Sequence, residues 1–69
     1  MKKSVNTLME EAIVENNIDL NSKFKLERVL LIDKICDKID WTEYNPFRAE
    51  RKVRVIETMV NMKFNEVKL

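Results

Sequence analysis

The sequence contains no glycine, and its only proline is Pro46. Chain reversals in sheets and in compact loops usually need glycine, proline or asparagine at backbone positions that other residues avoid. A β-rich or loop-rich fold of 69 residues would therefore lack most of its turn residues. We predict instead an all-α fold, a small three-helix bundle that forms a single domain over residues 1–69.

The first helix is predicted at about residues 4–16. Its apolar residues recur at the i, i+3, i+4, i+7 and i+8 positions of one helix face, and they are Val5, Leu8, Met9, Ala12 and Ile13. Two N-terminal caps compete, because Ser4 is a good capping residue and Thr7 begins a capping-box spacing one turn later. The asparagines at 16–17 are the expected stop, since asparagine tolerates the left-handed conformation that ends many helices.

A second helix is predicted at about residues 23–39, after a short connector. Either Asn21 or Ser22 is expected to cap its start. A broad apolar arc, about 160° wide on a helical wheel, contains Phe24, Val29, Leu31, Ile32, Ile35, Cys36 and Ile39. Leu26 and Leu30 lie on nearly the opposite side, so we expect this helix to pack between two neighbours.

The third helix is predicted at about residues 46–67. Asn45 is a good N-cap, and Pro46 suits the first helical position because the N–H that it lacks would be unpaired there. Spacings of three and four place one apolar seam, like that of a helical bundle, at Ala49, Val53, Ile56, Val60, Phe64 and Val67. A second apolar stripe lies away from this seam at Val55, Met59 and Met62. A chain this small has reason to cover such stripes, and a homodimer is the simplest way.

The residue inventory argues against catalysis. The chain has no histidine, so it lacks the usual general base near neutral pH and the Ser-His-Asp and Cys-His sets. One cysteine without histidine predicts no structural zinc site, and a glycine-rich phosphate loop is excluded. Cys36 lies on the apolar arc of the second helix and is interpreted as a buried structural thiol. We predict that the protein is not an enzyme and has no catalytic, cofactor-binding or metal-binding residues.

The sequence lacks a second cysteine and any long apolar segment, and both features bear on its cellular compartment. A single cysteine fits a reducing setting, with Cys36 as a free thiol. Charges interrupt every apolar stretch, and the initial residues 1–3 are not followed by the apolar core of a secretory signal. We therefore expect a cytoplasmic protein without a membrane partner.

Basic residues cluster at the start of the third helix. The stretch DWTEYNPFRAERKVR, residues 40–54, places three of the five aromatic residues just before four cations. The overall charge is only +1, which predicts no polyanion partner, yet the four cations and one carboxylate of residues 46–54 give that segment +3. Cations at a helix N-terminus oppose the helix dipole. Helix stability therefore does not explain why they are there.

Three interpretations of this cluster are open. It is a solvated face that the first helix partly neutralises through Glu10, Glu11 and Glu15; or it binds an acidic or mixed protein surface; or it binds nucleic acid. The last would make the chain a small helix-turn-helix-like transcriptional regulator that reads DNA with the start of its third helix. That motif fits less well, because the predicted connection of about six residues without glycine exceeds the usual three or four.

We predict a non-enzymatic protein–protein interaction module, an adaptor or inhibitor that occupies a surface of a larger protein. Tryptophan, tyrosine and arginine dominate binding hot spots, which favours the aromatic and basic residues as the contact surface. The predicted partner-binding residues are Trp41, Tyr44, Arg48, Arg51, Lys52, Val55 and Met59. By analogy, the size and composition would suit a small phage or mobile-element regulator of a host factor.

Overall fold

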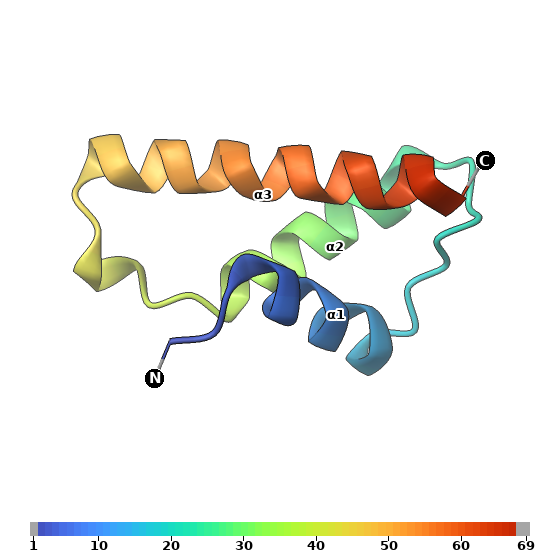
Figure 1. The fold of residues 1–69 in the computed structure, drawn as a ribbon, viewed down its shortest axis with the longest axis horizontal. Helices are drawn as coiled ribbons and strands as arrows, with labels where there is room; N and C mark the ends of the chain where they lie inside the picture. The colour runs from blue at the N-terminus through green and yellow to red at the C-terminus, as the bar shows by residue number, and fades with distance from the viewer. Residues whose placement is uncertain (1, 68–69) are drawn as a thin grey trace.

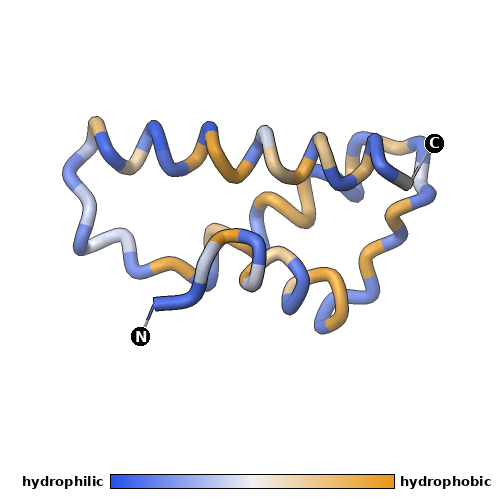
Figure 2. The backbone as a smooth tube through the Cα atoms, viewed as in Figure 1, coloured by the Kyte–Doolittle hydropathy of each residue, from blue (hydrophilic) through white to orange (hydrophobic). Residues whose placement is uncertain are grey.

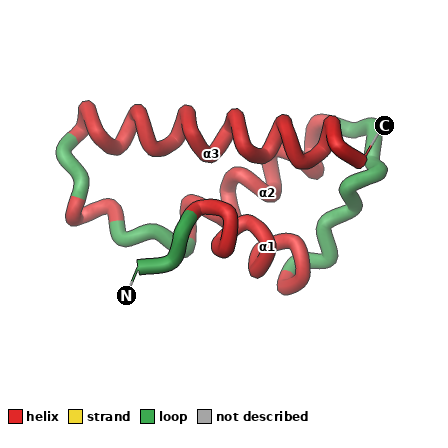
Figure 3. The backbone as a smooth tube through the Cα atoms, in the orientation of Figure 1, coloured by secondary structure: helices red, strands yellow, loops and turns green. Residues whose placement is uncertain are grey.

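The computed structural model describes residues 2–67, and side chains are described for residues 2–66. The helices are α1 (Val5–Glu15), α2 (Lys25–Asp37) and α3 (Pro46–Val67), with a short 3-10 helix, η1 (Trp41–Glu43), between α2 and α3. The described residues form no strand, and helices make up most of their length (Figure 3). The predicted all-α, three-helix bundle is confirmed.

The three helices differ greatly in length, and this sets the shape of the molecule. At 1.5 Å per residue, the 22 residues of α3 extend ~33 Å, close to the 35 Å long axis of the protein. The 13 residues of α2 and 11 of α1 extend only ~20 Å and ~16 Å. Figure 1 shows α2 crossing obliquely behind α3, with α1 below in front and with the start of α3 reaching past both. Each helix packs against the other two, as expected for α2.

The core draws on all three helices and on the connector after α1. Its buried residues are Val5, Leu8, Met9, Ala12, Ile18, Leu31, Ile35, Ile56, Val60 and Phe64. The three from α3 belong to the predicted seam, and Figure 2 shows the alternating apolar and polar bands along this helix. Ala49 and Val53 are only half-buried, because neither α1 nor α2 reaches that part of α3. The side chain of Val67, the last predicted seam position, lies outside the described residues.

Side-chain caps fix the ends of α1 and α3. Of the two competing caps, Ser4 is the one used: its hydroxyl accepts a hydrogen bond from the backbone N–H of Thr7 at 3.2 Å. Asn17 has φ 54°, in the left-handed region, which confirms the predicted stop. The predicted start of α3 is also confirmed, because the Asn45 side chain accepts a hydrogen bond from the N–H of Arg48 at 2.8 Å.

The prediction for α2 is wrong at its start. The helix begins at Lys25, two residues later than expected, and neither Asn21 nor Ser22 caps it. The Ser22 hydroxyl instead accepts from the N–H of Phe24 at 3.1 Å, while the N–H of Asn21 donates to Asp19 at 2.9 Å. Both side chains therefore stabilise turns in the connector, a use that competes with capping for the same residue types.

The end and the faces of α2 also differ from the prediction. The helix ends at Asp37 rather than at 39, because the next two N–H groups bond three residues back instead of four. Phe24 precedes the helix, so the wheel does not apply to it, and its side chain is exposed. Val29, at the edge of the arc, is exposed as well. On the opposite side Leu30 packs against the core whereas Leu26 is exposed.

Candidate partner-binding site

The aromatic turn is attached to the end of α2 by Trp41. Its indole N–H donates to the backbone carbonyl of Cys36 at 3.0 Å, and its ring packs against the core. The same carbonyl accepts a hydrogen bond from the backbone N–H of Ile39 at 3.2 Å, so the indole supplies its second hydrogen bond at the end of α2. Asp40 caps η1 by accepting hydrogen bonds from the side chain and the backbone N–H of Thr42, and these bonds lower the pKa of its carboxyl.

Tyr44 lies between an aromatic ring and two cations. Its ring centroid is 5.6 Å from that of Trp41, and the two planes are inclined by 54°. The Arg48 guanidinium carbon is 5.7 Å and the Lys52 ammonium nitrogen 5.9 Å from the Tyr44 centroid. All three distances are typical of attractive aromatic and cation–π contacts. Tyr44 thereby links η1 to the first turns of α3.

A second aromatic ring, that of Phe47, contacts Arg51. The Arg51 guanidinium carbon lies 5.9 Å from the Phe47 centroid, one helical turn away on α3. The Phe47 side chain is 69% exposed, so this pair lies at the surface. We refer to the aromatic–cation cluster as Trp41, Tyr44, Phe47, Arg48, Arg51 and Lys52. Sequence reasoning missed the role of Phe47, although the 47/51 spacing of four residues was a usable signal.

The glutamates of α1 do not neutralise this cluster. They form ion pairs elsewhere: Glu10 with Lys63 at 2.8 Å, Glu11 with Lys3 at 2.6 Å, and Glu15 with Lys38 at 2.5 Å. Within residues 2–66, Arg48, Arg51 and Lys52 have no carboxylate within 4.0 Å, whereas Arg54 pairs with Glu50 at 3.0 Å. The interpretation of a face neutralised by α1 is therefore not supported, and the three cations are held by aromatic rings.

The two apolar residues of the predicted site continue the same side of α3. Val55 is 48% exposed, and Met59 is half-buried because it packs against the edge of the core. They follow Arg48 and Lys52 at spacings of three and four residues, which keeps all four on one helix face. Of the seven predicted residues, Trp41 thus lies on η1, Tyr44 follows it directly, and the other five lie on α3.

An open cleft of about 510 Å³ adjoins the cluster between the N-terminal segment, the end of α2 and α3. Tyr44 and Lys52 form one side of it, and the cations Lys2 and Lys3 lie on another. Lys2 pairs with Glu43 of η1, across the cleft from α3. No sequence pattern predicted these neighbours, because only the tertiary fold brings the chain start to η1.

Arg28 and Cys36 have structural roles and lie outside the aromatic–cation cluster. The Arg28 guanidinium donates to the Asn61 side chain at 2.9 Å and lies 5.2 Å from the centroid of the buried Phe64 ring, so it covers the core from outside. Cys36 is half-buried, and burial, followed by the nearby carboxylates, raises the pKa of its thiol. A protonated, partly buried thiol agrees with a structural role.

Among the described residues, no group of three or more metal-binding side chains is close enough to hold an ion. No described helix has both the length and the apolar character for crossing a bilayer. The chain matches no family model, no curated protein and no solved structure. Its function is therefore inferred from the geometry of the aromatic–cation cluster.

The hydrogen bond that holds η1 can be tested by Trp41→Phe. This change keeps an aromatic ring but removes the indole N–H, so the free energy of unfolding should fall by ~0.5–1.5 kcal/mol. Because the chain has no other tryptophan, urea unfolding should be followed by circular dichroism. Trp41→Ala should cost more, since it also removes the ring contacts. Equal losses for the two variants would show that the N–H bond and not the ring anchors η1.

Proposed function

We propose that this protein binds an acidic or mixed surface of a larger protein through the aromatic–cation cluster and acts, without catalysis, as an adaptor or inhibitor. The supporting observation is that Arg48, Arg51 and Lys52 lie on aromatic rings and have no carboxylate partner among the described residues. Their charge is thus available to an anionic surface, whereas the glutamates and lysines around α1 already neutralise one another.

The rings also favour tight binding by limiting the motion of the cations. A long basic side chain loses rotamer freedom when it is fixed at an interface, which costs about 0.5–1.5 kcal/mol each. Contact with Tyr44 or Phe47 restricts that freedom before the partner arrives. An arginine on an aromatic face keeps its N–H donors free for a carboxylate. The cluster therefore combines charge for fast encounter with rings for specific contact.

The position of the cluster on α3 makes it accessible to a large partner. The first turns of α3 reach past α1 and α2 (Figure 1), so a surface approaching them meets η1, the connecting loop and, across the cleft, the N-terminal segment. Val55 offers an exposed apolar contact next to the cations. An interface of this composition, apolar at its centre and basic at its edge, is common in protein–protein recognition. A phage or mobile-element regulator of a host factor is a narrower form of this proposal.

A DNA-binding regulator is the second candidate, and the unpaired cations are what favour it. Its geometry fits less well. The connection between α2 and α3 covers residues 38–45 and contains η1, which is longer than both our prediction and the three or four residues typical of a helix-turn-helix. Arg48 and Lys52 are also directed toward Tyr44, on the side of α3 next to η1.

The test compares two triple variants of equal charge change. Arg48→Ala/Arg51→Ala/Lys52→Ala removes the cations of the cluster, and Lys23→Ala/Lys25→Ala/Lys34→Ala removes three cations near and on α2. Each chain is used to capture partners from lysate of the source cells, with and without nuclease treatment, and affinity for the captured protein is then measured. We expect the first variant to bind roughly ten- to a hundredfold more weakly and the control to bind normally.

Two results would contradict this proposal. Equal weakening by both variants would mean that overall charge and not the cluster matters. Capture that disappears with nuclease, together with binding to unrelated DNA sequences, would favour the second candidate. In that case the cluster variant should weaken binding to all sequences alike and reduce the salt dependence by about one unit of slope per lost phosphate contact.

A further inference from the structure

A second heptad repeat runs along the side of α3 that flanks the buried seam of Ile56, Val60 and Phe64. Its residues follow one another at spacings of 4, 3, 4, 3 and 4, and they are Arg48, Lys52, Val55, Met59, Met62 and Glu66. At 100° per residue these six positions share an arc of about 80°. Alternation of three and four is the pattern by which helices pair in coiled coils. We refer to this set as the outer seam.

The outer seam is open to contact. Met62 is 59% exposed and Val55 48% exposed, and the terminal residues Arg48 and Glu66 are exposed as well. Lys52 and Met59 are half-buried at the border of the seam. Two apolar side chains at this exposure, two turns apart on one long helix with Met59 between them, are a surface that association would cover.

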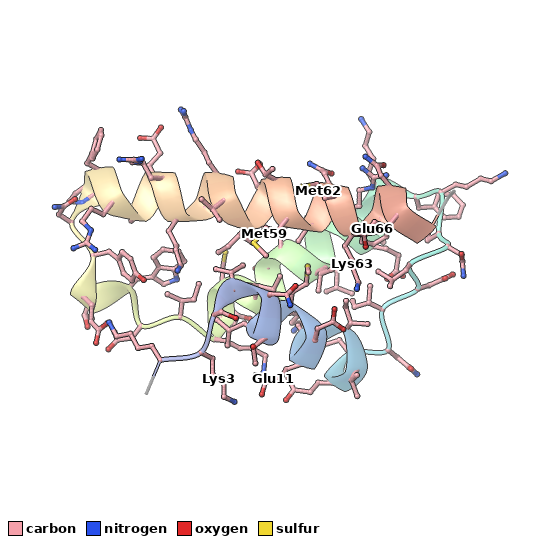
Figure 4. All side chains as sticks on the ribbon, viewed as in Figure 1. Lys3, Glu11, Met59, Met62, Lys63 and Glu66 are labelled. Carbon is pink, nitrogen blue, oxygen red and sulfur yellow. The ribbon has the colours of Figure 1, made fainter. Side chains whose placement is uncertain are left out.

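The side of α1 turns this seam into a shallow groove. A depression of about 270 Å³ is lined by Asn6, Met9 and Glu10 of α1 and by Met59, Met62, Lys63 and Glu66 of α3. Figure 4 shows both methionines on α3, with Lys63 reaching toward α1, where it pairs with Glu10. Methionine side chains adapt to irregular neighbours, which suits a groove that receives another helix.

The charges along the outer seam have an order. Arg48 and Lys52 make one end basic, Val55, Met59 and Met62 form the apolar middle, and Glu66 makes the other end acidic. Such a stripe is complementary to its own reverse, because an antiparallel copy places its acidic end against the basic end of the first. A parallel copy would instead align like charges. Two-fold symmetry is the commonest symmetry of protein dimers, and a two-fold axis perpendicular to α3 produces the antiparallel arrangement.

We infer that a second copy of this chain packs on the outer seam, with the two α3 helices antiparallel and the two-fold axis near position 57. In antiparallel coiled coils the a positions of one helix face the d positions of the other, and the seam obeys this throughout. The pairs between copies are Val55 with Met59, Lys52 with Met62, and Arg48 with Glu66. Each pair occurs twice, and the contact extends ~27 Å along α3.

This inference goes beyond the proposed function and rests on different observations. It uses the heptad spacing and the charge order, whereas the proposed function uses the contacts between rings and cations. The two surfaces share Arg48, Lys52 and Val55, so a second copy and a larger partner compete for one face. A monomeric chain would overturn the dimer and leave the proposed function standing.

The first test measures molar mass by sedimentation equilibrium from about 1 µM to about 1 mM chain. We expect a reversible monomer–dimer equilibrium. Met62→Asp places a carboxylate in the apolar middle of the seam and should abolish the dimer, while its helical spectrum stays unchanged because Met62 is exposed. Leu26→Asp, at an apolar site on α2 that is also exposed, is the matched control and should leave the dimer intact.

The second test examines the charge order. Glu66→Lys should raise the dimer dissociation constant by roughly two- to thirtyfold, because each exposed pair contributes little but occurs twice. The double variant Arg48→Glu/Glu66→Lys exchanges the charges and should restore the original dissociation constant. Failure of the exchange to restore it would contradict the antiparallel pairing.

The third test uses disulfide formation to determine which positions of the two α3 helices face each other. In a Cys36→Ser background, the double variant Arg48→Cys/Glu66→Cys should form dimers linked between positions 48 and 66, which peptide mass spectrometry identifies. The two positions lie ~27 Å apart along one helix, too far for a bond within one chain. Links from 48 to 48, a strict monomer throughout the concentration range, or a dimer unaffected by Met62→Asp would each overturn the inference.

Discussion

Ile56→Asp is expected to unfold this protein. Ile56 is fully buried in the seam of α3, and the described core contains no buried polar or charged side chain that could pair with a carboxylate. Placing an unpaired charge there costs several kcal/mol. Small domains have total stabilities at or below the low end of about 5–15 kcal/mol. The helical circular dichroism signal should be lost near room temperature.

Thr58→Asp is the matched control for this change. It introduces the same side chain into the same helix two residues later, at an exposed position. Substitutions at such sites usually change stability by no more than about 0.5 kcal/mol. The control should therefore keep its spectrum and nearly its melting temperature. If Ile56→Asp also melted like the unmodified chain, the buried seam of α3 would be misplaced.

Phe64→Ala is expected to lower the free energy of unfolding by ~3–5 kcal/mol. Phe64 is fully buried and has the largest side chain among the deepest core residues. Its removal leaves a cavity between the helices and deprives the Arg28 guanidinium of the ring that it covers. Denaturant unfolding followed by circular dichroism measures the loss directly.

The other phenylalanines provide the comparison. Phe24 is 77% exposed, so Phe24→Ala removes the same atoms but almost no packing, and stability should change by less than about 0.5 kcal/mol. Phe47→Ala loses only an exposed ring and its contact with Arg51. Similar losses at 24 and 64 would mean that the burial of Phe64 in the core is incorrect.

Most of the fold was predictable because α3 follows simple rules. Its start could be predicted because an asparagine followed by a proline is typical of a helix N-cap and its first helical position. Its seam could be predicted because spacings of three and four place the apolar residues on one face. The start of α2 was not predictable in this way. Asn21 and Ser22 stabilise turns as readily as they cap helices, and only the tertiary structure decides between the two uses.

The candidate site was predictable as a set of residues but not as a set of contacts. Aromatic residues at 41, 44 and 47 followed by cations indicated one shared side, and the structure forms two groups of contacts there, one around Tyr44 and one between Phe47 and Arg51. The partners of individual charges could not be read from the sequence. Lys2 pairs with Glu43, which is 41 residues away in the sequence. Helical periodicity likewise does not predict which lysines pair with the glutamates of α1. Such pairs depend on tertiary distances alone.

The unequal helix lengths have a consequence for local stability. Ile56, Val60 and Phe64 are fully buried, whereas Arg48 and Lys52 contact only Tyr44 beyond their own helix. Segments with few buried contacts open at lower free energy than the core. We therefore expect the backbone amides of the first turns of α3 to exchange faster than those around Ile56 to Phe64, so that the half of the helix that carries the cluster frays, and tolerates substitution, while the other half stays folded.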